Sequence, residues 1–130
     1  MKISYDIIEK LYQLKDEVSI LSFLEDNNYL IDFLIDFHKQ VTNIFKDNII
    51  AINLNLIHDP DIFDENILFA NIYTNLSVDD AMIKIGYLDD DWYLKNINKV
   101  KGMFNFDVEW DDYKYSTLED EEIINKVFNG

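Results

Sequence analysis

The sequence predicts an α+β fold, with a small three-stranded antiparallel sheet and helices packed on one face. Apolar residues recur with a helical period through the first third of the chain and then alternate with polar ones. The alternation leaves one side of each strand polar, which is typical of a sheet that is covered on one face only. Helices on both faces would require strands that are apolar on both sides.

The chain has the size and composition of a single globular domain. Its 130 residues can bury a core, and a hydrophobic content of 48% excludes a disordered chain. No Cys is present, so disulfides and thiolate metal sites are excluded. The apolar runs are far shorter than the ~18 residues of a membrane span, and no secretory signal is expected. We therefore predict a cytoplasmic protein.

Three helices are expected before the sheet. The first begins at Ser4 as N-cap, and the second covers residues 17–25. After the helix-breaking pair Asn27-Asn28, a longer helix covers residues 29–45. The first helix carries its apolar stripe on Ile7, Ile8, Leu11 and Leu14.

Three strands follow from period-2 alternation. Residues 50–57 and 67–75 form two strands, joined by a connection around Pro60 that is short enough for an antiparallel hairpin. The stretch MFNFDVEWDD, residues 103–112, gives the third strand. Its alternate positions are predicted to lie in the core: Phe104, Phe106, Val108 and Trp110.

Helical segments separate and follow the last two strands. Ser77 and Asp80 form a near capping box that opens one helix, and Gly86 is expected to end or kink it. A second helical piece begins at the aspartates before Trp92 and stops at Gly102. A last helix is expected from residue 117 to 128. The predicted order is ααα-ββ-α-β-α.

The charge balance narrows the choice of partner. All eleven basic residues are Lys, against 26 acidic ones, which gives a net charge of −15. Nucleic acids and anionic membranes are disfavoured, because their binding depends on cations that neutralise phosphates. Codon usage in an AT-rich genome explains Lys in place of Arg, but not the acidic excess. The acidic density is highest after residue 102.

The polar side of the predicted sheet is the candidate partner-binding surface. Its members are Asn53, Asn55, Asn71, Tyr73, Asn105, Asp107 and Glu109. Two interpretations are open: a solvated face without a specific role, or a flat acidic surface that docks a basic protein.

The segment His58-Asp59-Pro60-Asp61 is the strongest candidate for a metal site. His58 lies near three carboxylates, Asp59, Asp61 and Asp64, but the glycine and the terminal glutamate of a calcium loop are missing. A turn whose aspartates bind backbone amides is the preferred interpretation. We predict no metal and no cofactor.

No motif in the chain indicates an enzyme. The nucleophile-elbow, zinc-protease, P-loop and dinucleotide-binding patterns are all missing. The pair Asp107 and Glu109 could act as acid and base only inside an apolar pocket, whereas their strand positions predict exposure.

A set of motifs in a fixed order resembles a family of small acidic bacterial proteins. These motifs are Ile20–Glu25, Asp59–Asp61, Thr74–Ala81, Leu88–Leu94, Lys101–Gly102 and Phe106–Trp110. The family is frequent in cyanobacteria and has no assigned function, so the resemblance implies no active site. It covers about residues 19–110 of the single domain and leaves residues 111–130 as an acidic C-terminal extension.

Three functions remain open. The favoured one is a non-catalytic, acidic protein-binding module, such as an antitoxin or immunity protein that covers a basic surface of a toxin. The second is a structural or regulatory subunit without an inhibitory role, and the third is a metal-dependent enzyme that uses the His58 loop.

Overall fold

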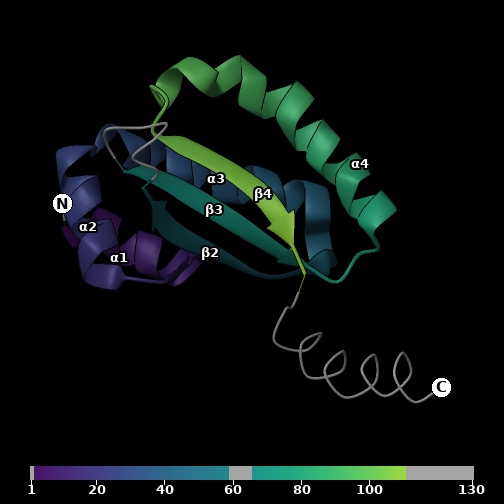
Figure 1. The fold of residues 1–130 in the computed structure, drawn as a ribbon, viewed down its shortest axis with the longest axis horizontal. Coiled ribbons are helices and arrows are strands. Elements are labelled where there is room, and N and C mark those ends of the chain that lie inside the picture. Colours follow the sequence, from purple (N-terminus) through teal and green to yellow (C-terminus); the bar gives the residue numbers. More distant parts are fainter. Residues whose placement is uncertain (1, 59–65, 111–130) are drawn as a thin grey trace, which may run out of the picture.

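A computed structural model describes residues 2–58 and 66–110 of the chain, with side chains from residue 5 onward. It has the predicted α+β class, with four α-helices and a four-stranded sheet among the described residues (Figure 1). The helices are α1 (Lys2–Leu11), α2 (Glu17–Asp26), α3 (Tyr29–Phe45) and α4 (Val78–Leu88). The strands are β1 (Gln13–Leu14), β2 (Ile49–Ile57), β3 (Ile67–Thr74) and β4 (Phe104–Glu109).

The sheet is mixed and has four strands in the order β1-β2-β3-β4, so the prediction of three antiparallel strands was wrong in two respects. The hairpin β2–β3 is antiparallel as expected, but β4 runs parallel to β3. The two-residue strand β1 also joins the sheet, parallel to β2. The predicted first helix ends at Leu11, and the chain then extends to pair with β2.

The parallel pairing of β3 and β4 follows from the helices between them. Parallel neighbours need a crossover connection of about a dozen residues or more, usually helical, and the segment between β3 and β4 provides one. The crossover contains α4, a π-helical turn η2 (Asp89–Tyr93) and a 3₁₀ segment η3 (Leu94–Lys99). In Figure 1 this crossover passes along the β4 side of the sheet. The strand–helix–strand pattern was therefore a signal for a parallel pair.

Several helix boundaries match local chemistry. The predicted helix over residues 29–45 is α3, and Asn27 caps the end of α2 as the Asn27-Asn28 break indicated. Ser77 Oγ accepts a hydrogen bond from the backbone N–H of Asp80 at 3.2 Å, which confirms the cap of α4. We expected Gly86 to end or kink this helix; the helix continues through Gly86 to Leu88, so it does not end there.

The second predicted helical piece consists of the η2 and η3 turns in place of a regular α-helix. It ends near Gly102, whose φ of +77° suits a residue without a Cβ. The helix expected over residues 117–128 lies outside the described residues, and α1 begins at Lys2 and not after Ser4.

The core lies between the sheet and α3, which crosses behind the strands in Figure 1. Aromatic rings of α3 and β4 meet there: Phe37 lies 5.1 Å from Phe104 and 5.2 Å from Phe106, between ring centroids. Phe104 and Val108 are buried as predicted, while Phe106 and Trp110 are half-buried against the core. None of the described helices combines the length and apolar character needed to cross a membrane.

Candidate functional site

The face of the sheet opposite α3, here called the open sheet face, brings the predicted partner-binding residues into register. One row runs across all four strands and contains only polar residues. Another row joins Ala51, Tyr73 and Glu109, and a third joins Asn55, Phe69 and Asn105. The four-strand row is Gln13, Asn53, Asn71 and Asp107. Gln13 was missed by sequence reasoning because two residues are too short for a strand pattern.

Exposure is unequal across the open sheet face. Asn105 and Asp107 are exposed, whereas Asn53, Asn55, Tyr73 and Glu109 are half-buried. Asn71, in the middle of the sheet, is only 8% exposed. Its Nδ2 donates a hydrogen bond to Glu109 Oε1 at 3.2 Å, which holds that carboxylate over the sheet. Asp107 is thus the exposed carboxylate of the predicted set, and Glu109 is half-buried.

One buried polar atom of this face is unsatisfied. Among the buried side-chain nitrogen and oxygen atoms of residues 5–58 and 66–110, Asn53 Oδ1 alone has no hydrogen-bond partner. Leaving a buried acceptor unpaired costs about 1–3 kcal/mol.

The outer edge of β4 is protected by side chains of the same face. Asn105 Oδ1 accepts a hydrogen bond from the N–H of Phe106, and Asp107 Oδ1 accepts one from the N–H of Val108, both at 2.8 Å. Among the described strands, none pairs with the edge to which these donors belong. Occupied donors hinder the addition of a foreign strand. We therefore expect a partner to use the face of the sheet and not the edge of β4.

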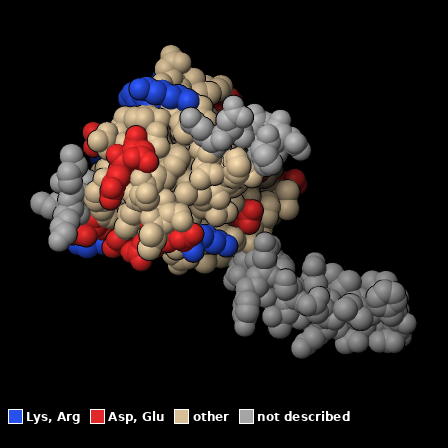
Figure 2. Space-filling model, turned by 60° about the vertical axis from the view of Figure 1, so that its left-hand side comes forward, with Lys and Arg blue, Asp and Glu red and all other residues tan. Residues whose placement is uncertain are grey.

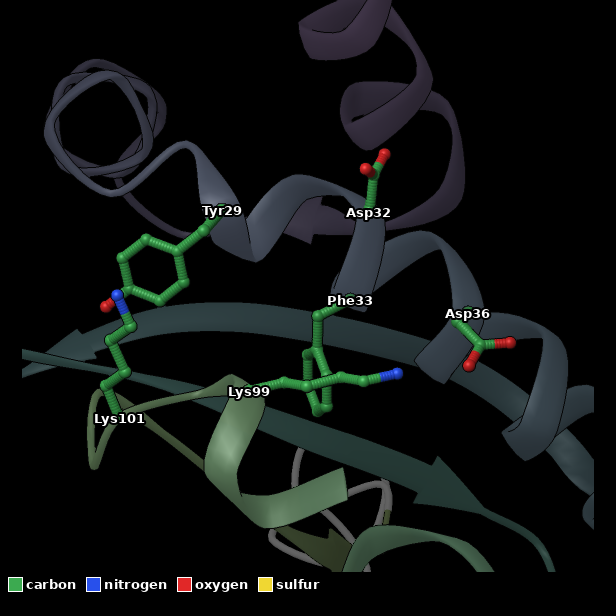
Figure 3. Close-up of a pocket in the computed structure, with 6 residues that line it drawn as sticks. All are labelled: Tyr29, Asp32, Phe33, Asp36, Lys99 and Lys101. Atoms are coloured by element: carbon green, nitrogen blue, oxygen red, sulfur yellow. The ribbon is translucent and has the colours of Figure 1, made fainter. Parts of the chain in front are cut away.

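A hollow of about 350 Å³ lies on the other side of the molecule, between α3 and the segment after η3 (Figure 3). Lys101 Nζ lies 4.6 Å from the centre of the Tyr29 ring, and Asp36 Oδ2 accepts a hydrogen bond from Trp92 Nε1 at 3.1 Å. Figure 3 shows Asp32 pointing away from the two lysines. The residues that line the hollow are Tyr29, Asp32, Phe33, Asp36, Lys99 and Lys101. The hollow contains none of the predicted site residues.

The outward side of α4 carries apolar side chains in contact with solvent. Of the eight large apolar residues that are exposed in the described chain, six fall between residues 78 and 97. They are Val78, Met82, Ile83, Tyr87, Leu94 and Ile97, each between 44% and 58% exposed. Exposed apolar residues gathered in one region are a mark of interaction surfaces. Sequence reasoning missed this surface because it did not distinguish the two sides of this helix.

Gly86 occupies the same helix. A Cβ built at this position would meet no atom within 4 Å, so no internal packing requires a glycine there. A glycine inside a helix costs about 0.5–1 kcal/mol relative to alanine. The described fold gives no compensation for that cost.

The predicted metal candidate is only partly described. His58 is exposed at the end of β2, while Asp59, Asp61 and Asp64 lie outside the described residues. Within residues 2–58 and 66–110, no group of three or more His, Asp or Glu side chains could hold a metal ion.

Three titratable groups with shifted pKa values lie in or beside the core. Burial raises the pKa of the Tyr12 hydroxyl well above its ordinary value, and burial lowers the pKa of His38. Burial, with the nearby charge of Asp89, raises the pKa of Tyr93. These shifts accompany packing around α3 and do not indicate an acid–base pair on the open sheet face.

Charged side chains are distributed over the surface. Over the side shown in Figure 2, acidic side chains form separate groups with uncharged surface between them. On this side, the described acidic side chains do not form one continuous area.

The comparisons with known proteins give no relative. No family model matches this chain, and neither a curated protein nor a solved structure matches it significantly. The resemblance to small acidic bacterial proteins stays a prediction.

Proposed function

We propose that this protein is a non-catalytic module that binds a basic protein through its open sheet face. In its most specific form, the proposal is an antitoxin- or immunity-type inhibitor that covers a basic surface of its target. The observation that carries it is the polar row across four strands, which ends at the exposed carboxylate of Asp107.

The chemistry of this face suits lysine and arginine side chains. Carboxylates and amide oxygens accept hydrogen bonds from cationic groups, and bonds to charged groups are about twice as strong as neutral ones. Glu109 is already oriented by Asn71, so part of the entropic cost of fixing its side chain is met before a partner arrives. The overall negative charge would also accelerate the approach of a basic partner.

The test is to locate where a cationic chain binds. A 20-residue oligolysine is titrated into ¹⁵N-labelled protein at low ionic strength. The amides of residues 51–55, 69–73 and 105–109 should shift together. The variant Asp107→Asn with Glu109→Gln removes two charges and keeps one acceptor oxygen on each side chain. It should weaken binding about fivefold, the scale of two exposed ion pairs.

The matched control is Glu25→Gln with Asp26→Asn, which removes the same charge from the exposed end of α2. It should weaken binding by a smaller factor than the sheet-face variant, because these charges lie outside the open sheet face and act only through the long-range field. Equal weakening by both variants, or shifts confined to residues outside the open sheet face, would refute this docking site.

A further inference from the structure

The outward side of α4 is a second surface, made by elements that do not contribute to the open sheet face. Ala81 and Leu88 point into the core and are fully buried. Met82, Ile83 and Tyr87 lie on the solvent side of the same helix, each about half exposed. The helix therefore carries apolar side chains on both sides, although only one side packs against the core.

Gly86 lies among these exposed side chains. It is four residues after Met82 and three after Ile83, and such spacings place residues side by side on a helix surface. Without a side chain, this position leaves a shallow gap between the neighbouring side chains. Internal packing does not require this glycine, and one use of a residue without a side chain is the close approach of a bound partner to the backbone.

Acidic residues border the apolar surface at both ends. Asp79 and Asp80 lie in the first turn of α4, and Asp89, Asp90 and Asp91 follow its last residue. Lys84 and Lys95 are the only basic residues of the region 78–97. The surface combines an apolar centre with an excess of negative charge at its rim.

We propose that the outward side of α4 binds an amphipathic basic helix of a partner protein. The apolar side of that helix packs on Met82, Ile83 and Tyr87 and approaches most closely at Gly86. Its lysine or arginine residues meet the aspartates at the two ends of α4. This is the helix-against-apolar-surface mode of recognition, with charges that select the partner.

Charge favours this occupant over the two that the chain itself could supply. A second copy carries the same aspartates and the same net charge of −15, so a symmetric contact would bring like charges together. Residues 111–130 contain six acidic residues and two lysines, which disfavours them for the same reason. A basic helix neutralises the negative charge of these aspartates, whereas a second copy or residues 111–130 would add to it.

The probe is a 14-residue peptide of leucine and lysine with leucines at helical spacing, added to the full chain at about 0.15 M salt, where long-range attraction is screened. It should bind at least tenfold more tightly than a peptide of the same composition without an apolar side. The variant Met82→Gln with Ile83→Gln should weaken binding at least tenfold. Val18→Gln, at an apolar residue of α2 that is 79% exposed, is the control and should not change it.

Gly86→Ala separates docking from folding. Alanine should raise the melting temperature, because it favours the helix, and should weaken peptide binding severalfold, because its methyl group fills the gap. Unchanged affinity in this variant, equal binding of both peptides, or equal weakening by Val18→Gln would overturn the proposal. Tighter binding by a second copy, or by a peptide of residues 111–130, would overturn the assignment of a basic partner. Asp107→Asn with Glu109→Gln should leave this binding intact, which keeps the test separate from that of the open sheet face.

Discussion

Helices α3 and α4 both send an apolar stripe into the core, but their outer sides differ. The outer side of α3 carries exposed polar residues such as Asp32 and Lys39. That of α4 carries Met82, Ile83 and Tyr87. The buried side chains of α3 pack in the core. Helix α4 also has apolar side chains that no other part of the described chain covers. Amphipathic patterning thus explains α3 completely and α4 only in part.

The largest expected effect is on the inner side of α3. Phe37 is fully buried, and its ring lies close to Phe104, Phe106 and Trp92. Phe37→Ala should lower the free energy of unfolding by about 3–5 kcal/mol, measured by urea denaturation, because it leaves a cavity among aromatic rings. Phe106→Ala, at a half-buried position, should lose less. A larger loss at Phe106 would show that the centre of the core lies on β4 and not on α3.

A smaller effect is expected where α1 joins α3. The buried Tyr12 hydroxyl donates a hydrogen bond to the backbone oxygen of Leu34. Tyr12→Phe removes this bond while the Leu34 oxygen keeps its partner within α3, so the change should cost about 1.5 kcal/mol near neutral pH, the upper end for one hydrogen bond.

The same residue gives a pH dependence. Burial raises the pKa of Tyr12 above the 10.0 of an exposed tyrosine, so its contribution is complete below pH 10 and is lost as the pH rises further. Tyr93 acts with the same sign. Wild type should therefore lose stability above pH 10 more steeply than Tyr12→Phe in urea denaturation at several pH values. Identical slopes would mean that Tyr12 ionises as readily folded as unfolded.

Sequence reasoning succeeded where one segment alone determines the structure. The stripe of α3, the cap at Ser77 and the alternation of β2 and β3 are local patterns, and each was found. The parallel direction of β4 and the short strand β1 were missed, because they depend on pairing between segments far apart in the chain.

The candidate site divides in the same way. Strand parity placed Asn53, Asn71 and Asp107 on one face, and the register brings them into one row. Parity could not show that Asn71 is buried or that Asp107 binds the N–H of Val108, since both depend on neighbouring strands and on the sheet edge. The exposed apolar side of α4 was also not predicted, because the sequence alone does not show which apolar residues of a helix have a packing partner.

The smallest expected effect concerns the contact between the two helical regions. Asp36 of α3 accepts a hydrogen bond from Trp92 Nε1, just after α4, and Phe33 packs 5.2 Å from the Trp92 ring. Asp36→Ala should lower the free energy of unfolding by about 0.5–1.5 kcal/mol, the net value of one such bond at a half-buried site. Asp32→Ala, one turn earlier on α3 and fully exposed, is the matched control and should change it by less than about 0.5 kcal/mol. The fluorescence of Trp92 should change only in the first variant, because only there does the indole lose its acceptor. If Asp36→Ala changes neither stability nor fluorescence, the packing of the aromatic rings alone holds the two helical regions together, and the hydrogen bond adds nothing to the contact.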